Sequence, residues 1–191
     1  MPISALKLLE LNKRYNLIEN LSERELENPE GVGTDLRVGE VYQAIEPGFL
    51  GVEERHTPEI KKIADINNGD KKVVLNPGSY VLVKTIERVN IPSEKIVLEK
   101  WKAAKYLMPV VFPRSTLQRC GIALFRTKTD PGYSGELTFG LANLGKQKFV
   151  FELGARMFNI VFEPVVGELG RAYSGQHNLG RVSGGITEVQ N

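Results

Sequence analysis

Short runs of apolar and β-branched residues recur along most of the chain, separated by turn-forming residues. The clearest runs cover residues 80–86, 137–141, 149–153 and 158–162. The first of them follows residues 76–79 (NPGS), where Pro and Gly stand as a type II turn requires. Short strands at this spacing predict an all-β fold, either a sandwich, a jelly roll or a barrel.

Three segments have a helical pattern. Residues 3–11 predict a short N-terminal helix capped by Ser4, with Ile3, Leu6 and Leu9 at helical spacing. Residues 57–66 (TPEIKKIADI) predict a second short helix that begins with a proline. Residues 115–120 predict one or two helical turns, which Gly121 would end.

The remaining segments and the length predict one domain over residues 1–191. Within it, residues 1–32 form the N-terminal helix and a loop, because residues 22–33 are charged and end in Pro and Gly. Residues 173–191 are rich in Gly and Ser and poor in large apolar side chains. They predict a flexible tail that a ligand would order.

Charge and hydropathy exclude several classes of function. The 25 basic and 23 acidic residues are dispersed and leave a net charge of +2, which disfavours a nucleic-acid partner. The longest strongly apolar stretch, residues 106–112, contains Pro and is too short to span a bilayer. The N-terminus lacks the pattern of a signal peptide, so we expect a cytoplasmic protein without a membrane partner.

Cysteine and histidine are scarce. Cys120 is the only cysteine, and His56 and His177 are the only histidines. This composition excludes an internal disulfide and disfavours a zinc site of the Cys/His kind. Zinc-dependent deamination is therefore excluded.

Residues 113–119 (PRSTLQR) form the first polar segment with candidate chemistry. Arg114 and Arg119 offer guanidinium groups suited to phosphate oxygens, and Ser115 and Thr116 add hydroxyl donors. Taken alone, the segment is more typical of a solvated basic turn with a capping serine.

Three further segments carry polar groups that are individually ambiguous. Asp130 precedes Pro-Gly, where it either shapes a turn or orients a water molecule, and Tyr133 follows with a flat ring. Asp35, entering a strand, either pairs with an arginine or holds a metal through water. In the tail, side chains that could fold over phosphates are Tyr173, Gln176 and Arg181, whereas His177 has the pattern of a surface residue.

In their order and spacing, these segments resemble the superfamily of trimeric dUTPases and dCTP deaminases. The resemblance rests on residues 33–39 (GTDLRVG), 87–92 (ERVNIP), 113–117 (PRSTL) and 130–135 (DPGYSG), and covers about residues 33–185. It implies a distorted jelly roll or β-roll that forms a homotrimer with active sites shared between subunits. It also implies Mg²⁺ bound through a nucleoside triphosphate.

The resemblance assigns roles to individual residues. Arg114, Ser115 and Thr116 would bind phosphates, and Tyr133 would pack against the deoxyribose. In the deaminase branch, which Arg119 and the Tyr173–Gln176 spacing resemble, a glutamate after the Asp-Pro-Gly hairpin shuttles protons without zinc. An ungapped alignment from Asp130 places Gly140 at that position.

Glycine cannot transfer a proton, and Glu136 lies about 13 Å away along the same strand face. Hydrolysis of dUTP needs only a carboxylate to orient water, for which Asp130 is the candidate, with Asp35 supporting the metal through water. The sequence therefore favours a dUTP diphosphatase over a dCTP deaminase, which could also form dUMP. A non-catalytic nucleotide-binding protein is the third hypothesis. The stretch of residues 96–111, which includes Trp101, is longer than the corresponding part of the family pattern and has no assigned function.

Overall fold

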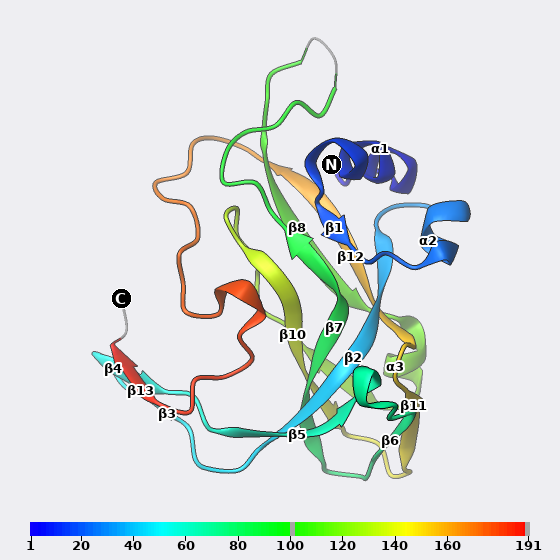
Figure 1. Ribbon diagram of the computed structural model, residues 1–191, viewed down its shortest axis with the longest axis vertical. Coiled ribbons are helices and arrows are strands. Elements are labelled where there is room, and N and C mark those ends of the chain that lie inside the picture. The colour runs from blue at the N-terminus through cyan, green and yellow to red at the C-terminus, as the bar shows by residue number, and fades with distance from the viewer. Residues whose placement is uncertain (100–101, 190–191) are drawn as a thin grey trace.

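The structure is a computed structural model that describes residues 1–99 and 102–189. Trp101 lies outside these residues. The largest element is an eight-stranded antiparallel sheet in which β8, β12, β2, β7, β10 and β9 follow one another, while β1 pairs with β7 and β5 with β2 (Figure 1). The expected mainly-β fold is confirmed.

Long, curved strands form the body of the sheet. They are β2 (Thr34–Ala44), β7 (Tyr80–Asn90), β8 (Tyr106–Pro113), β10 (Ser134–Asn143) and β12 (Arg156–Val165). The shorter strands of this sheet are β1 (Ile18–Glu19), β5 (Ile60–Asp65) and β9 (Ile122–Phe125). Alternate side chains of the long strands point to the core, as in β7, where every second residue is buried. Phe139 and Phe158 meet there with ring centroids 4.7 Å apart.

Two smaller sheets complete the fold. One pairs β6 (Lys72–Leu75) with β11 (Phe149–Glu152). The other joins β3 (Phe49–Leu50) and β4 (Glu54–His56) with β13 (Thr187–Val189) from the tail. The sequence predicts a flexible tail that a ligand would order. In the structure, β13 of this tail pairs with a hairpin of its own chain (Figure 1).

The helices are short. Helix α1 (Ala5–Tyr15) begins at Ser4, whose side chain accepts a hydrogen bond from Lys7 N, so the predicted cap is confirmed. Its buried face differs from the expected one, because Leu8 and Leu11 are buried whereas Leu6 is 71% exposed. Helix α3 (Ser115–Arg119) is followed by Gly121 at φ +74°, as predicted. The remaining turns are α2 (Glu23–Glu27) and the 3-10 segments η1 (Ile66–Asn68) and η2 (Asn178–Gly180).

Two predictions of secondary structure are wrong. Residues 57–66 form no helix, because the second half of β2 takes β5 as its partner, with Val41 opposite Ala64. Pairing with a long strand outweighs a weak local helical pattern. The segment expected as a loop contains α2. The Ser-x-x-Glu spacing of Ser22 and Glu25 is a sequence signal of a helix start, but the Ser22 side chain forms no capping hydrogen bond among the described residues.

The turn before β7 has the predicted form. Gly78 has φ +77° and Ser79 N donates to Asn76 O at 3.0 Å, so the turn before β7 is the predicted one. Residues 96–111 contain the start of β8 and a bridge between Ile96 and Lys105. Among the described residues, no helix is long and apolar enough to cross a membrane.

Candidate active site

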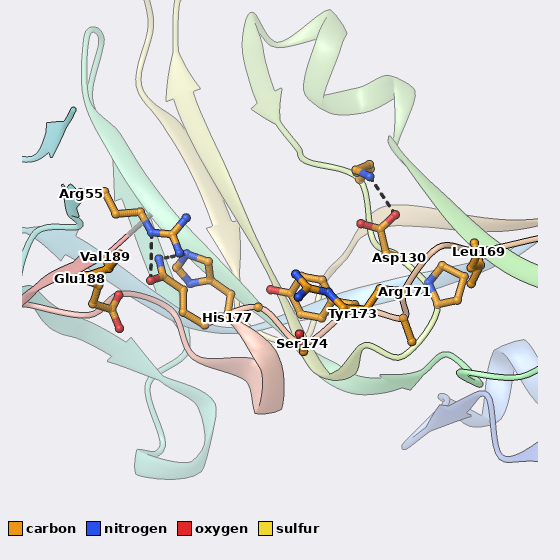
Figure 2. A pocket seen from close by; sticks show the side chains of 14 residues that line it. Arg55, Asp130, Leu169, Arg171, Tyr173, Ser174, His177, Glu188 and Val189 are labelled. Atoms are coloured by element: carbon orange, nitrogen blue, oxygen red, sulfur yellow. Dashed lines mark hydrogen bonds and ion pairs between the residues drawn. The ribbon is translucent and has the colours of Figure 1, made fainter. Parts of the chain in front are cut away.

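A cavity of about 1060 Å³ opens where the hairpin before β10, the tail and β4 meet. Asp130 and Arg171 lie at one end, Arg55 and His177 at the other, and Tyr173 between them (Figure 2). A second pocket of about 420 Å³ shares Asp130, Tyr173 and His177, and extends to Tyr133 and Arg181. Around these two pockets the structure therefore brings together predicted residues from two segments. They are Asp130 and Tyr133 of the hairpin, and Tyr173, Gln176 and Arg181 of the tail.

A tight turn places Asp130 at the edge of this cavity. Tyr133 N donates to Asp130 O at 3.2 Å, and Gly132 between them has φ +98°. A Cβ at Gly132 would lie 3.0 Å from Tyr173 N, so glycine permits the tail to lie directly on the turn. The carboxylate is partly exposed, and Lys128 Nζ donates to its Oδ1 at 3.0 Å. Oδ2 has no hydrogen-bond partner among the described residues, which leaves Asp130 able to bind a water molecule or substrate group.

Tyr133 forms a rigid wall beside Asp130. Its ring is 8% exposed and lies 5.8 Å from the Tyr173 ring, and its hydroxyl donates to Glu136 O at 2.7 Å. Burial raises the pKa of Tyr133 well above its ordinary value, and the proximity of Tyr173 and Glu136 adds to this. The phenol is thus a neutral, packed surface rather than a proton donor at physiological pH.

The cationic side chains that line the two pockets differ in whether they form an ion pair. Arg181 is paired with Glu188 at 2.7 Å and Lys128 with Asp130, whereas Arg55 and Arg171 form no ion pair with any described residue. Sequence motifs missed Arg55, Lys128 and Arg171. Lys128 and Arg171 are close to motif residues in the sequence, but Arg55 is brought to the cavity only by the pairing of β4 with β13.

The residues predicted to bind phosphate lie elsewhere in the chain. Ser115, Thr116 and Arg119 are on α3, on the opposite side of the molecule from the β13–β4–β3 sheet (Figure 1). All three are exposed, and their side chains form no hydrogen bond within residues 1–99 and 102–189. Within one subunit, therefore, the predicted phosphate residues and Asp130 form two separate groups.

Arg114 is held in an ion-pair cluster. Its guanidinium contacts Asp35 Oδ2, which also accepts from Arg156 Nη1 at 3.2 Å, while Asn159 donates to Asp35 Oδ1 at 3.0 Å. Asp35 is 6% exposed. The buried Glu25 completes the cluster by accepting from the Thr34 hydroxyl and the Asp35 amide.

These contacts do not fit a metal ligand at Asp35. Both carboxylate oxygens already accept from cationic or amide donors, and two arginines would repel a divalent ion. The described part of the chain holds no cluster of three His, Cys, Asp or Glu side chains suited to a metal. The contacts of Asp35 therefore give no support to the metal role expected of this residue.

A side chain at Gly140 would require the Tyr80 ring to move. A Cβ there would lie 2.3 Å from the Tyr80 hydroxyl, because the Tyr80 ring covers this position on the outer face of β10. Glu136 does not replace it. Its carboxylate faces Lys84 Nζ at 3.7 Å and the tail at Gly180, where an added Cβ would meet Oε2 at 2.2 Å. Among the described residues that line the smaller pocket, Asp130 is the only acid.

Comparison with known proteins identifies the family. A family model described as dCTP deaminase-like matches residues 4–165. The chain therefore belongs to the dCTP deaminase-like family, within the superfamily of dUTPases and dCTP deaminases, and the resemblance drawn from its motifs is confirmed.

Relatives within this family carry two different names. A protein of Methanothermobacter thermautotrophicus named a probable deoxyuridine 5'-triphosphate nucleotidohydrolase is 32% identical over 153 residues, which is 80% of this chain and 88% of that protein. A Natronomonas pharaonis protein named dCTP deaminase is 30% identical over 173 residues, which is 83% of this chain and 82% of that protein. These names do not distinguish the two reactions for this chain.

The fold has a counterpart among solved structures. The 2'-deoxycytidine 5'-triphosphate deaminase of Agrobacterium tumefaciens superimposes with a TM-score of 0.59 at 15% identity. The match covers 84% of this chain and 47% of that one, so the chain spans about half of its length. At this identity the match supports the β-roll architecture alone.

Proposed function

We propose that the protein is a dUTP diphosphatase, which hydrolyses dUTP to dUMP and pyrophosphate. The observation that carries this proposal is which acidic side chains the site contains. Asp130 is present and partly exposed, whereas position 140 is a glycine and Tyr80 fills the space that a side chain there would need. Hydrolysis at phosphorus needs one carboxylate to orient water, but deamination needs an acid that shuttles protons at the base.

In the proposed mechanism, Asp130 accepts a proton from a water molecule whose oxygen attacks the α-phosphorus. The bond from the α-phosphorus to the bridging oxygen breaks, and pyrophosphate leaves with the electron pair. Mg²⁺ carried by the triphosphate would neutralise phosphate charge when bound. Tyr133 would pack against the deoxyribose and disfavour a 2′-hydroxyl.

A complete site would draw on two subunits of a homotrimer. Ser115, Thr116 and Arg119 are exposed and line neither pocket that contains Asp130, so a neighbouring copy must supply them if they bind the same triphosphate. Mixing two inactive variants, Arg119→Ala and Asp130→Asn, tests this arrangement. Shared sites predict that about a quarter of the sites recover activity in an equal mixture. No recovery would favour sites built within one chain.

The second candidate is a dCTP deaminase, and its support is the relative of that name together with the family description. Purified protein with Mg²⁺ should be offered dUTP and dCTP separately, and the bases and phosphates resolved by chromatography. The proposal expects dUMP and pyrophosphate from dUTP, and intact dCTP. Formation of dUTP or dUMP from dCTP would overturn it.

A further inference from the structure

The hairpin of residues 45–59, which contains β3 and β4, lies outside all four motif segments and yet reaches the cavity. We propose that this hairpin is a clasp that holds the tail over its own subunit's cavity before nucleotide binds, and that its Arg55 positions Gln176 and contacts the phosphate chain. The contact with phosphate rests on the proposed function, whereas the clasp does not.

The clasp is a set of hydrogen bonds between the hairpin and the tail. Gly184 N donates to Thr57 Oγ1 at 2.9 Å and Gly185 N donates to Thr57 O at 3.0 Å. The Ser183 hydroxyl donates to Pro58 O. Beyond them β13 pairs with β4, with Glu188 opposite Arg55. These bonds involve the backbone of both segments, so they fix the path of the tail.

A second anchor holds the tail against β10. Ser134 N donates to Asn178 Oδ1 at 2.9 Å. A Cβ at Gly135 would lie 2.2 Å from Gly180 N, so the two glycines pack backbone against backbone. Because the tail is fixed at η2 and again at β13, its closed path requires no ligand.

Arg55 connects the clasp to the residues that face the cavity. Its Nε donates to Gln176 Oε1 at 3.1 Å, and Gln176 Nε2 lies 3.0 Å from His177 Nε2. Since arginine has only donors, this contact fixes the amide of Gln176 with its NH₂ group towards His177. His177 Nδ1 in turn lies 3.3 Å from Arg181 O, an acceptor, so Nδ1 is the ring nitrogen placed to donate to this carbonyl.

The outer nitrogens of Arg55 remain available. Neither Nη atom has a hydrogen-bond partner within the described ranges, and the cross-strand neighbour Glu188 is paired with Arg181. A planar guanidinium with two free donors matches phosphate oxygens. Because Arg55 and Asp130 lie at opposite ends of the cavity (Figure 2), a triphosphate whose α-phosphorus is at Asp130 would extend its outer phosphates towards Arg55.

The test compares Arg55→Ala with wild type, using Arg14→Ala on α1 as the matched control. Calorimetry would measure binding of α,β-imido-dUTP, which cannot be hydrolysed, and of dUMP. We expect Arg55→Ala to weaken the triphosphate analogue about tenfold or more, and dUMP by less than about threefold. Arg55→Lys keeps the positive charge but loses the planar pair of guanidinium donors. It should therefore recover only part of the affinity for the triphosphate analogue.

Amide hydrogen exchange of residues 173–189 without nucleotide tests the clasp independently of the phosphate contact. Wild type should protect amides of Gly184 and Gly185, and both Arg55→Ala and Thr57→Val should accelerate their exchange. Exchange in wild type as fast as in an unstructured peptide would overturn the clasp. Equal weakening of dUMP and the analogue, or none, would overturn the phosphate contact. A wild type that protects its tail but leaves dUTP intact would overturn the proposed function alone.

Discussion

Two regions of the molecule contain an aspartate that the sequence motifs single out, and the structure treats them in opposite ways. Asp35 is 6% exposed, and its oxygens accept from Arg114, Arg156 and Asn159. The side chain of Asp130 is 33% exposed and has Lys128 as its one partner in the described chain. The first carboxylate is saturated and the second has capacity left for a ligand.

The same contrast holds for the arginines around them. Arg114 and Arg156 are committed to buried carboxylates, whereas Arg55 and Arg171 face a cavity without an ion pair to any described residue. A buried ion-pair cluster fixes local structure, because removing one partner leaves the other charge uncompensated. Unpaired cations in a cavity instead attract an anionic ligand. We therefore infer that the Asp35 cluster stabilises the fold, whereas the cavity at Asp130 binds the ligand.

Asp130→Asn is the substitution with the largest expected effect. Asparagine preserves the shape but cannot accept the proton of water, so we expect dUTP turnover to fall by about a thousandfold or more. The free energy of unfolding should change by less than about 0.5 kcal/mol, because Asp130 is partly exposed. Steady-state kinetics and urea unfolding of the same preparation would check both values. Retained turnover would remove the contrast between the two regions.

Asp35→Ala should show the reverse pattern. Its loss leaves Arg114 and Arg156 without a carboxylate partner, and the partial exposure of both arginines limits the cost to about 2–3 kcal/mol of unfolding free energy. Urea denaturation would measure it, with Glu94→Ala as the control, since Glu94 is an exposed carboxylate without a side-chain partner among the described residues. A fully stable Asp35→Ala protein that has lost turnover would instead make Asp35 a functional residue.

Much of the fold could be predicted from the sequence, because local signals and tertiary structure agree there. Ser4 caps α1, Gly121 ends α3, and the strand pattern of residues 80–86 lies within β7. The prediction failed at residues 57–66, where pairing with β2 decides the structure. A weak helical pattern carries no information about a strand that needs a partner.

The candidate site could be predicted in part. The motifs locate Asp130, Tyr133 and Gln176. Asp130 lines both pockets, whereas Gln176 lines the larger and Tyr133 the smaller one. Arg55 could not be found, since a hydrogen bond across 121 residues of sequence joins it to Gln176. The hydrogen-bond partners of Asp35 could not be predicted either, because Arg156 and Asn159 lie outside every motif.

Gly140→Ala would sharpen the argument against deamination. The added Cβ would meet the Tyr80 hydroxyl at 2.3 Å, so the ring must move and we expect a loss of about 1–3 kcal/mol. The double variant with Tyr80→Ala should recover part of this stability, which thermal unfolding of both proteins would measure. If Gly140→Ala is as stable as wild type, Tyr80 does not close the position, and a glutamate there becomes sterically acceptable.

Tyr133→Phe should have the smallest effect and tests whether the phenol is a packed wall. The hydroxyl contributes a buried hydrogen bond to Glu136 O at 2.7 Å, so its removal should cost about 1 kcal/mol of stability and leave turnover nearly unchanged.

Burial raises the pKa of Tyr133 above the unfolded value of about 10. Its contribution is therefore complete below about pH 10 and falls as the pH rises beyond that value. The stability gap between wild type and Tyr133→Phe should narrow from pH 9 to about pH 11, measured by urea unfolding. A gap that widens instead would mean that the phenol ionises more easily in the folded protein, and Tyr133 would then be a candidate proton donor within the Asp130 cavity.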